Sequence, residues 1–250
     1  MSQNNHSNRK PKRTARERLR QERKKERAAE RRKRTLKVAA AAVAVLAIAA
    51  GAGIIATGRD SDDSGNGPEA RPVSVGQNDA PATLTVYEDF RCPACAAFET
   101  GFRDTIHELT GAGKLRVEYH LVTIIDGNLG GSGSRQAANA AACARDEGKF
   151  TEYHDVLFAR QPAETEDAYA DTSHLLELAD EVSGLDSPAF RDCVTGGKHD
   201  DWVRRSNAAF LDSGYNATPT VLLNGEDVYG DSSDPLTPER LEERVNDLAS

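Results

Sequence analysis

The chain has 250 residues, which is enough for one sizeable domain or two small ones. Its 32 Lys and Arg residues and 40 Asp and Glu residues give a formal net charge of −8, and 38% of the residues are hydrophobic. This composition excludes a protein with many membrane spans and a chain that is disordered throughout. The 4 cysteines are too few for a scaffold held together mainly by disulfides.

The charge is divided unevenly along the chain. Met1–Lys37 contains 16 basic and 4 acidic residues, a net charge of +12, whereas the rest of the chain contains 16 basic and 36 acidic residues, a net charge of −20. Because the basic arm adjoins an apolar run, we expect it to bind anionic lipid head groups, at about 1 kcal/mol per basic residue near the surface. We favour this interpretation over nucleic-acid binding and expect no nucleic-acid partner.

The apolar run Val38–Gly58 contains no charged residue and is long enough to cross a membrane as a helix. Basic residues precede it and acidic residues follow it, which predicts a cytoplasmic N-terminus and an exported body. A buried core helix is the alternative, because alanine and glycine make the run only moderately apolar. We expect a single-pass protein of the cell membrane.

Cleavage after the apolar run would instead release the body as a secreted protein. Small residues at Ala47–Ala49 and Ala50–Ala52 fit the pattern of a signal peptidase site. The length of the basic region favours an uncleaved signal anchor. The expected order is a cytoplasmic arm at 1–37, a transmembrane anchor at 38–58, a polar linker at 59–81 and an exported domain at 82–250.

The exported body has the pattern of one α/β domain. A helical pattern lies between two segments of strand-like composition, which predicts a parallel pair of strands with a right-handed crossover. The expected strands are 83–90 and 114–125, followed by a hairpin of 220–223 and 227–229 around an Asn-Gly turn. The expected helical segments are 96–110, an inserted block at about 126–217, and a last helix beginning at Pro238.

Cys92-Pro93-Ala94-Cys95 follows the first expected strand and opens the first helix. At the start of a helix, unpaired backbone N–H groups and the positive end of the helix dipole stabilise a thiolate. A stabilised thiolate at Cys92 is both a nucleophile and a good leaving group in thiol–disulfide exchange, and Cys95 lies one turn further on. The motif therefore predicts a reactive cysteine pair.

A zinc site and an inert structural bridge are the two alternatives for this motif. Zinc needs two more ligands at suitable spacing, and the remaining Cys143 and Cys193 stand alone in the sequence. We expect no metal and no cofactor. An inert bridge stays possible, but it does not explain why the motif sits between a strand and a helix.

Three segments resemble the DsbA-like thiol–disulfide oxidoreductases of the thioredoxin-like superfamily, especially the membrane-tethered actinobacterial type. They are EDFRCPACAAFE, SRQAANAAACARDEGKFTEYHDVLFARQ and the Ala217–Thr220 element before the closing hairpin, within a resemblance that covers about Gln77–Ala249. The resemblance implies a thioredoxin-like fold with an inserted helical domain. It also implies a cis Thr218–Pro219 peptide beside the cysteines, where the Thr218 backbone can pair with an extended substrate.

The sequence departs from this family at two places. The family commonly has a buried acid six residues before the first cysteine, where it exchanges protons with the second cysteine; that position is Val86 here. Glu88 and Asp89 are candidates to replace it, and they would point to opposite faces of a strand. The Pro93-Ala94 pair also lacks the histidine of the best-known oxidases, which predicts milder oxidising power.

Cys143 and Cys193, 50 residues apart in the helical block, are expected to form a structural disulfide, because an exported domain favours bridge formation. A bridge around such a loop contributes about 4 kcal/mol to stability in the chain-entropy model. The alternative is a redox relay to Cys92 and Cys95, which nothing in the spacing supports.

We therefore expect a monomeric, extracytoplasmic oxidase that donates its Cys92–Cys95 disulfide to exported proteins. A mixed disulfide would form at Cys92. The resemblance implies reoxidation by a quinone-linked membrane partner. The alternatives are a reductase or isomerase of the same fold, and a tethered peptide-binding module without catalytic activity.

Overall fold

The computed structural model describes residues 71–230 and 234–250. The expected cytoplasmic arm and the expected transmembrane anchor both lie outside these residues. Within the described part of the chain, no helix is both long and apolar enough to span a membrane.

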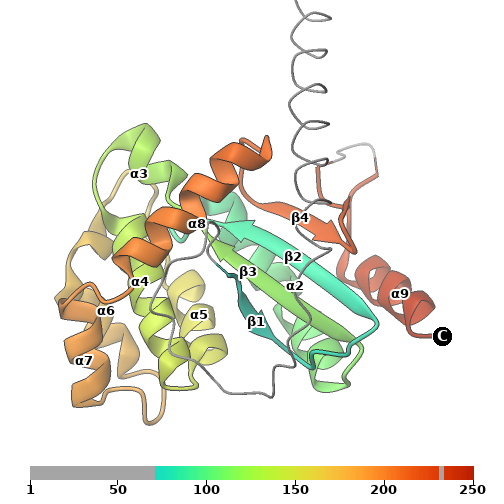
Figure 1. Cartoon of the computed structure of the whole chain (residues 1–250), viewed down its shortest axis with the longest axis horizontal. Coiled ribbons are helices and arrows are strands. Elements are labelled where there is room, and N and C mark those ends of the chain that lie inside the picture. The colour runs from blue at the N-terminus through green and yellow to red at the C-terminus, as the bar shows by residue number, and fades with distance from the viewer. Residues whose placement is uncertain (1–70, 231–233) are drawn as a thin grey trace, which may run out of the picture. The chain divides into compact units, whose positions relative to one another are not determined.

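A 5-stranded sheet with the order β1-β3-β2-β4-β5 lies at the centre of the body (Figure 1). The pair β2 and β3 runs parallel, and the other three pairs are antiparallel. The two parallel strands are joined through a helix, as the order of the predicted elements requires. The strands are β1 (Val73–Val75), β2 (Ala82–Glu88), β3 (Leu115–Leu121), β4 (Thr220–Leu223) and β5 (Glu226–Asp227).

Helices cover both faces of the sheet. Figure 1 shows α2 behind the strands and α8 in front of them, and both helices contact β3. The segments from α3 to α8 all lie between β3 and β4 in the chain, so they form the inserted helical block. The helices are α2 (Pro93–Gly111), α3 (Ile124–Leu129), α4 (Gly133–Asp146), α5 (Phe150–Ala159), the 3-10 helix η1 (Ala168–Ala170), α6 (Thr172–Ala179), α7 (Pro188–Thr195), α8 (Asp200–Ser213) and α9 (Pro238–Leu248).

The helical block is organised around α4. This helix contacts α5, α6, α7, α8 and η1. Its alanines at 137, 138 and 140–142 are completely buried, so small side chains let the neighbouring helices approach closely.

Side chains alternate along β2 between a buried face and a partly exposed face. Leu84, Val86 and Glu88 are all on the buried face. Tyr87 points to the opposite face, where its ring lies 5.4 Å from that of Phe210 in α8. From the carboxyl end of β2, the central strand, the chain passes through residues 89–92 into α2, so Cys92 lies close to the end of that strand.

Several predictions about strands need correction. The first strand ends at Glu88 and not at residue 90, and the last strand is Glu226–Asp227 and not 227–229. The segment 59–81 contains β1, a three-residue strand that pairs with β3 from Val73 to Val75, so the linker is shorter than its polar composition indicates. The second predicted strand, 114–125, ends at Leu121. Leu121 pairs with Glu88, the last residue of β2, so the ladder ends on both strands together, and Ile124 begins α3.

Candidate active site

Cys92 and Cys95 lie together at the beginning of α2, as the motif predicts. Cys92 is the N-cap residue, with an extended backbone, and Pro93 occupies the first helical turn, where a missing N–H costs no hydrogen bond. Both cysteines are free thiols, and they differ in access. Cys92 is 7% exposed and Cys95 is 0% exposed, so an incoming sulfur meets Cys92 first.

The two sulfurs have opposite acid–base properties. Hydrogen bonds from the Cys95 thiol and, more weakly, from the backbone N–H groups of Cys95 and Ala94 lower the pKa of Cys92 to about 6, although burial acts in the other direction. Burial raises the pKa of Cys95 well above its ordinary value, and the neighbouring Cys92 sulfur adds to this. Near neutral pH, Cys92 is therefore the thiolate and Cys95 the thiol.

The Thr218–Pro219 element, directly before β4, lies beside Cys92. The peptide bond between these residues is cis, as the resemblance implies. The Cys92 sulfur lies 3.4 Å from the carbonyl oxygen of Thr218. The backbone that could pair with an extended substrate is thus directly beside the more accessible sulfur.

Gln161 fixes the peptide that carries Cys92. Its side-chain amide donates hydrogen bonds of 2.9 Å to the carbonyl oxygens of both Phe90 and Cys92. Gln161 follows α5, so the helical block holds the loop between β2 and α2 in place.

Arg91 provides a second connection between this loop and the helical block. Its guanidinium is 2% exposed and lies 2.8 Å from Asp126 and 3.0 Å from Asp167. These two carboxylates also accept the N–H groups of residues 132–135 at the start of α4. Gly133 is required here, because a Cβ atom would lie 2.5 Å from Asp167. The buried cation is thereby neutralised, and the beginning of α4 is joined to the cysteine loop.

Asp89 closes the turn before Arg91 and does not occupy a strand position. Its carboxylate accepts the backbone N–H groups of Arg91 and Ile125, each at 2.9 Å. Burial raises the pKa of Asp89 to about 6. Glu88 and Asp89, the candidates to replace an acid at Val86, were expected to point to opposite faces of a strand. The structure differs, because β2 ends at Glu88 and the chain turns at Asp89, and both side chains are buried.

Glu88 belongs to a separate buried cluster with Glu99 of α2 and His154 of α5. One carboxylate oxygen of Glu88 lies 2.7 Å from Nε2 of His154. The three side chains are 1%, 4% and 2% exposed, and their ligand atoms all lie within 4.8 Å of one another. Such a set could hold a metal ion, but it also balances its own charge, because the Glu88 carboxylate raises the pKa of His154 to about 10 against the effect of burial.

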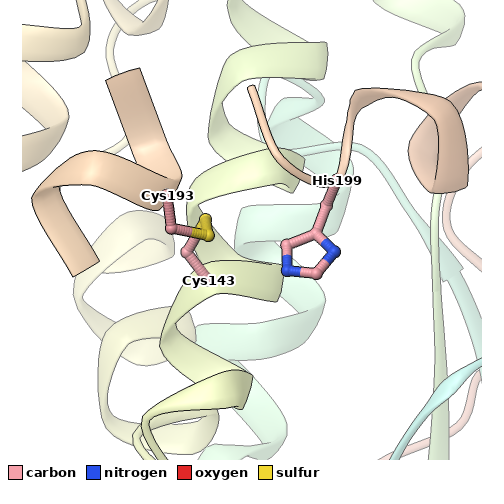
Figure 2. A group of neighbouring side chains, drawn as sticks. All are labelled: Cys143, Cys193 and His199. Atoms are coloured by element: carbon pink, nitrogen blue, oxygen red, sulfur yellow. A yellow bond between two sulfur atoms is a disulfide. The ribbon is translucent and has the colours of Figure 1, made fainter. Parts of the chain in front are cut away.

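Cys143 and Cys193 form a disulfide, as predicted. The bridge joins α4 to α7, and the His199 ring lies beside it (Figure 2). Nε2 of His199 is 2.8 Å from Asp146. The bonded sulfurs are not available as metal-binding thiolates.

Sequence reasoning missed Arg91, Gln161, His154 and Glu99. Arg91 and Glu99 stand close to the cysteines in sequence, but their partners are brought in by the helical block. The one signal that could have pointed to Glu99 is its spacing, four residues after Cys95, which places both on one face of α2.

The match to known families decides the identity of the fold. A family model described as Thioredoxin matches residues 69–247. The chain belongs to the thioredoxin family. Its architecture is the thioredoxin-like α/β fold with a helical insertion that the resemblance implies.

Similar solved structures and a curated relative place the chain within this family. Oxidised DsbA of Mycobacterium tuberculosis is 32% identical, with a TM-score of 0.61, over 72% of this chain and 93% of that one. Reduced DsbG of the same organism is 31% identical, with a TM-score of 0.60, over 72% of this chain and 88% of that one. Disulfide bond formation protein D of Bacillus subtilis is 26% identical over 158 residues, 62% of this chain and 68% of that protein.

These relatives and the geometry identify the chain as a DsbA-like thiol–disulfide oxidoreductase. Its reaction is dithiol–disulfide exchange. This result favours an enzyme over the peptide-binding module without catalytic activity.

Proposed function

We propose that this protein is an extracytoplasmic oxidase that transfers the Cys92–Cys95 disulfide to exported proteins. The observation that carries the proposal is the position of Cys92 at the N-cap of α2, next to the fully buried Cys95, where the Cys95 thiol and backbone N–H groups lower the pKa of Cys92 to about 6. A stabilised Cys92 thiolate favours the reduced protein, and a couple whose reduced form is stabilised is a stronger oxidant.

The proposed reaction has two exchange steps. A substrate thiolate attacks Cys92 of the oxidised protein, and Cys95 leaves as the thiolate that is then protonated. The second thiolate of the substrate then attacks the substrate sulfur that is bonded to Cys92, and Cys92 leaves as a stable thiolate. The substrate ends with a disulfide and this protein with a reduced pair.

The proposal includes a membrane-tethered location, with the N-terminus in the cytoplasm and the catalytic domain outside. Its support is the Val38–Gly58 run and the basic residues before it. Tethering would keep the reduced domain close to a quinone-linked membrane partner that reoxidises it, as the family resemblance implies. The disulfide between Cys143 and Cys193 is consistent with an oxidising compartment.

A refolding assay tests the oxidase activity. The oxidised full chain, purified in detergent, is mixed with one equivalent of a reduced and unfolded disulfide protein such as ribonuclease A. We expect disulfides to appear in the substrate as thiols appear at Cys92 and Cys95. A chain that transfers no disulfide to the substrate, but reduces disulfides when supplied with thiols, would be a reductase.

A labelling experiment tests the location. In intact cells treated with a mild reductant, a membrane-impermeant thiol reagent should label Cys92 of the Cys95→Ser variant. Labelling only after the cells are lysed would contradict an exported domain. A band shortened by the basic arm and most of the apolar run would indicate cleavage and secretion.

A further inference from the structure

The Glu88–Glu99–His154 cluster is a group of buried ionisable side chains that the exchange steps do not use. β2 supplies Glu88, α2 supplies Glu99 and α5 supplies His154, so the cluster lies where the helical block meets the sheet and the first helix. All three side chains are buried. Glutamates are almost never buried this deeply unless they are paired or bind a metal ion.

Pairing satisfies only part of the cluster. Nε2 of His154 lies 2.7 Å from Oε1 of Glu88. The other carboxylate oxygen of Glu88 and Oε1 of Glu99 are buried and have no hydrogen-bond partner within the part of the chain that the structure describes. Buried oxygens that lack a donor are costly in free energy. The cluster therefore has acceptor positions that a cation can fill.

The distances within the cluster suit one small cation. One ligand atom from each of the three residues lies within 4.8 Å of the other two. Around a tetrahedral zinc ion, with bonds of about 2.0–2.2 Å to nitrogen and oxygen, neighbouring ligand atoms are about 3.3–3.5 Å apart. The contact between Glu88 and His154 then has to lengthen by less than about 1 Å, and no other distance has to shorten by more than about 1.5 Å. Small rotations of the glutamate side chains supply shifts of this size.

The charges also balance. Two carboxylates and a neutral imidazole around a divalent cation have a net charge of zero, so the filled cluster buries no excess charge. Arg103 does not enter this balance, because it pairs with Asp155 at 3.3 Å. A monovalent cation would leave one negative charge in the core. The cluster is therefore matched to a divalent ion.

His154 has the surroundings of a histidine that binds a metal ion. Such a histidine usually directs its other ring nitrogen to a carboxylate, a carbonyl or water. Nδ1 of His154 lies 3.8 Å from Oδ1 of Asp155. Asp155 is itself held by Arg103 and His107, each at 3.3 Å. This leaves Nε2, which lies beside Glu88, as the coordinating nitrogen.

Aromatic rings fix the imidazole and keep water away from it. The ring centroids of Phe90, Tyr119, Phe150 and Phe158 lie 4.6–5.6 Å from that of His154. An apolar shell strengthens the electrostatic interactions inside a metal site and limits the access of solvent.

The types of ligand favour zinc. Calcium and magnesium are bound by oxygen atoms, whereas zinc accepts imidazole and carboxylate together. Three protein ligands leave one of its four coordination positions for water.

We propose that Glu88, Glu99 and His154 bind one zinc ion, which fastens α5 of the helical block to β2 and α2. The proposal does not depend on whether the protein is an oxidase or a reductase. The sequence does not indicate this site, because its ligands come from three elements that meet only in the fold. Binding to the folded state alone would make the stability of the domain depend on zinc.

Zinc uptake by the oxidised full chain tests the proposal. The chain carries no polyhistidine tag, is purified in detergent, and has both cysteine pairs oxidised, so that no thiolate can bind the metal. It is stripped with a chelator, incubated with buffered zinc and dialysed, and bound zinc is measured by inductively coupled plasma mass spectrometry. We expect one equivalent of zinc. The midpoint of thermal unfolding should rise by about 5–10 °C when free zinc is about 100-fold above its dissociation constant.

Two variants and a matched control locate the ion. Glu99→Gln keeps the size of the side chain and removes one ligand charge. Asp155→Asn acts through His154 and should weaken zinc binding about 10–100-fold, and Glu99→Gln should weaken it at least about 100-fold, because it removes a ligand itself. The control His174→Gln removes a partly exposed histidine that lies 3.8 Å from Glu177. It should bind zinc as tightly as the unsubstituted chain.

X-ray absorption at the zinc K-edge gives a readout that needs no variant, in case Glu99→Gln does not fold. In the loaded, unsubstituted chain we expect nitrogen and oxygen at about 2.0–2.2 Å from zinc and no sulfur at about 2.3 Å.

Three results would overturn the proposal. One is an unsubstituted chain that retains no zinc and whose thermal unfolding does not change with zinc. Another is equal affinity for zinc in a folded Glu99→Gln variant and in the unsubstituted chain. The third is sulfur bound to the zinc, which would place the ion at the cysteines. Failure of disulfide transfer in the refolding assay would end the oxidase proposal without affecting this one.

Discussion

The two cysteine pairs show how one chemical group acquires different roles in the same domain. Cys92 and Cys95 are three positions apart at the start of a helix, and Cys92 faces the Thr218 carbonyl. Cys143 and Cys193 join two helices of the inserted block across 50 residues. Surroundings that stabilise a thiolate favour reaction, whereas a bridge between packed helices favours permanence.

The hydrogen bonds around each pair support this contrast. Around the first pair, N–H groups point at the sulfur, and Gln161 holds the carbonyl oxygens on either side of Arg91. Around the second pair, Asn139 bonds the carbonyl of Val194 and the N–H of His199, so it fixes the backbone of the α7 region. One network positions a sulfur for attack, and the other holds two helices together.

Replacing the accessible sulfur should give the largest effect. In Cys92→Ser, we expect thiol–disulfide exchange to fall at least about 1000-fold, because the nucleophile is lost. Cys95→Ser should still attack and should accumulate a mixed disulfide at Cys92. Non-reducing electrophoresis and mass spectrometry measure both, and substantial turnover by Cys92→Ser would contradict the roles given to this pair.

Removing the second pair should change stability but not reactivity. In the double variant Cys143→Ala and Cys193→Ala, the free energy of unfolding should fall by about 4 kcal/mol, within a general range of 0–5 kcal/mol. The exchange rate of Cys92 should stay within about 2-fold, since distant sites act nearly independently. Denaturant unfolding and an exchange assay provide the two readouts. A large loss of exchange in a folded variant would support the relay alternative.

The support of the first pair by the helical block can be tested at Gln161. Gln161→Ala should lower the free energy of unfolding by about 1–3 kcal/mol, because the buried carbonyls of Phe90 and Cys92 lose a donor. Gln161→Glu has the same shape but presents a carboxylate to these carbonyls. It should destabilise more near pH 7 and raise the pKa of Cys92. If both variants are as stable as the unsubstituted chain, the hydrogen bonds from Gln161 to Phe90 and Cys92 do not contribute to stability.

The sequence predicted the parts of this site that are local. A strand, a CxxC motif and a helix in succession are enough to place Cys92 and Cys95 at a helix start. The partners of Arg91 could not be predicted in this way, because Asp126 and Asp167 reach it only after α3 and η1 have packed. The strand at Val73–Val75 could not be predicted from its own residues for the same reason, since its hydrogen bonds are made with β3, which is distant in the sequence.

Acid should slow the first pair by a smaller factor. With a pKa of about 6, Cys92 is mostly thiolate at pH 7 and mostly thiol at pH 5. The rate at which Cys92 of the reduced chain attacks a small aromatic disulfide, 5,5′-dithiobis(2-nitrobenzoic acid), should therefore fall about 10-fold between these pH values. The ultraviolet absorbance of the Cys92 thiolate, measured at each pH without the reagent, gives an independent titration. A rate that follows an ordinary thiol, with a pKa of about 8.5, would contradict the proposed stabilisation of Cys92.

The reduction potentials of the two pairs, measured in one titration, test the central contrast most directly. The full chain is equilibrated with glutathione buffers of graded potential, and the free thiols of each pair are trapped and identified by mass spectrometry. We expect Cys92–Cys95 to be reduced at a potential above about −200 mV, and Cys143–Cys193 to stay oxidised down to about −300 mV. A Cys92–Cys95 potential near −270 mV, which is about that of thioredoxin, or two pairs that are reduced together would contradict the account.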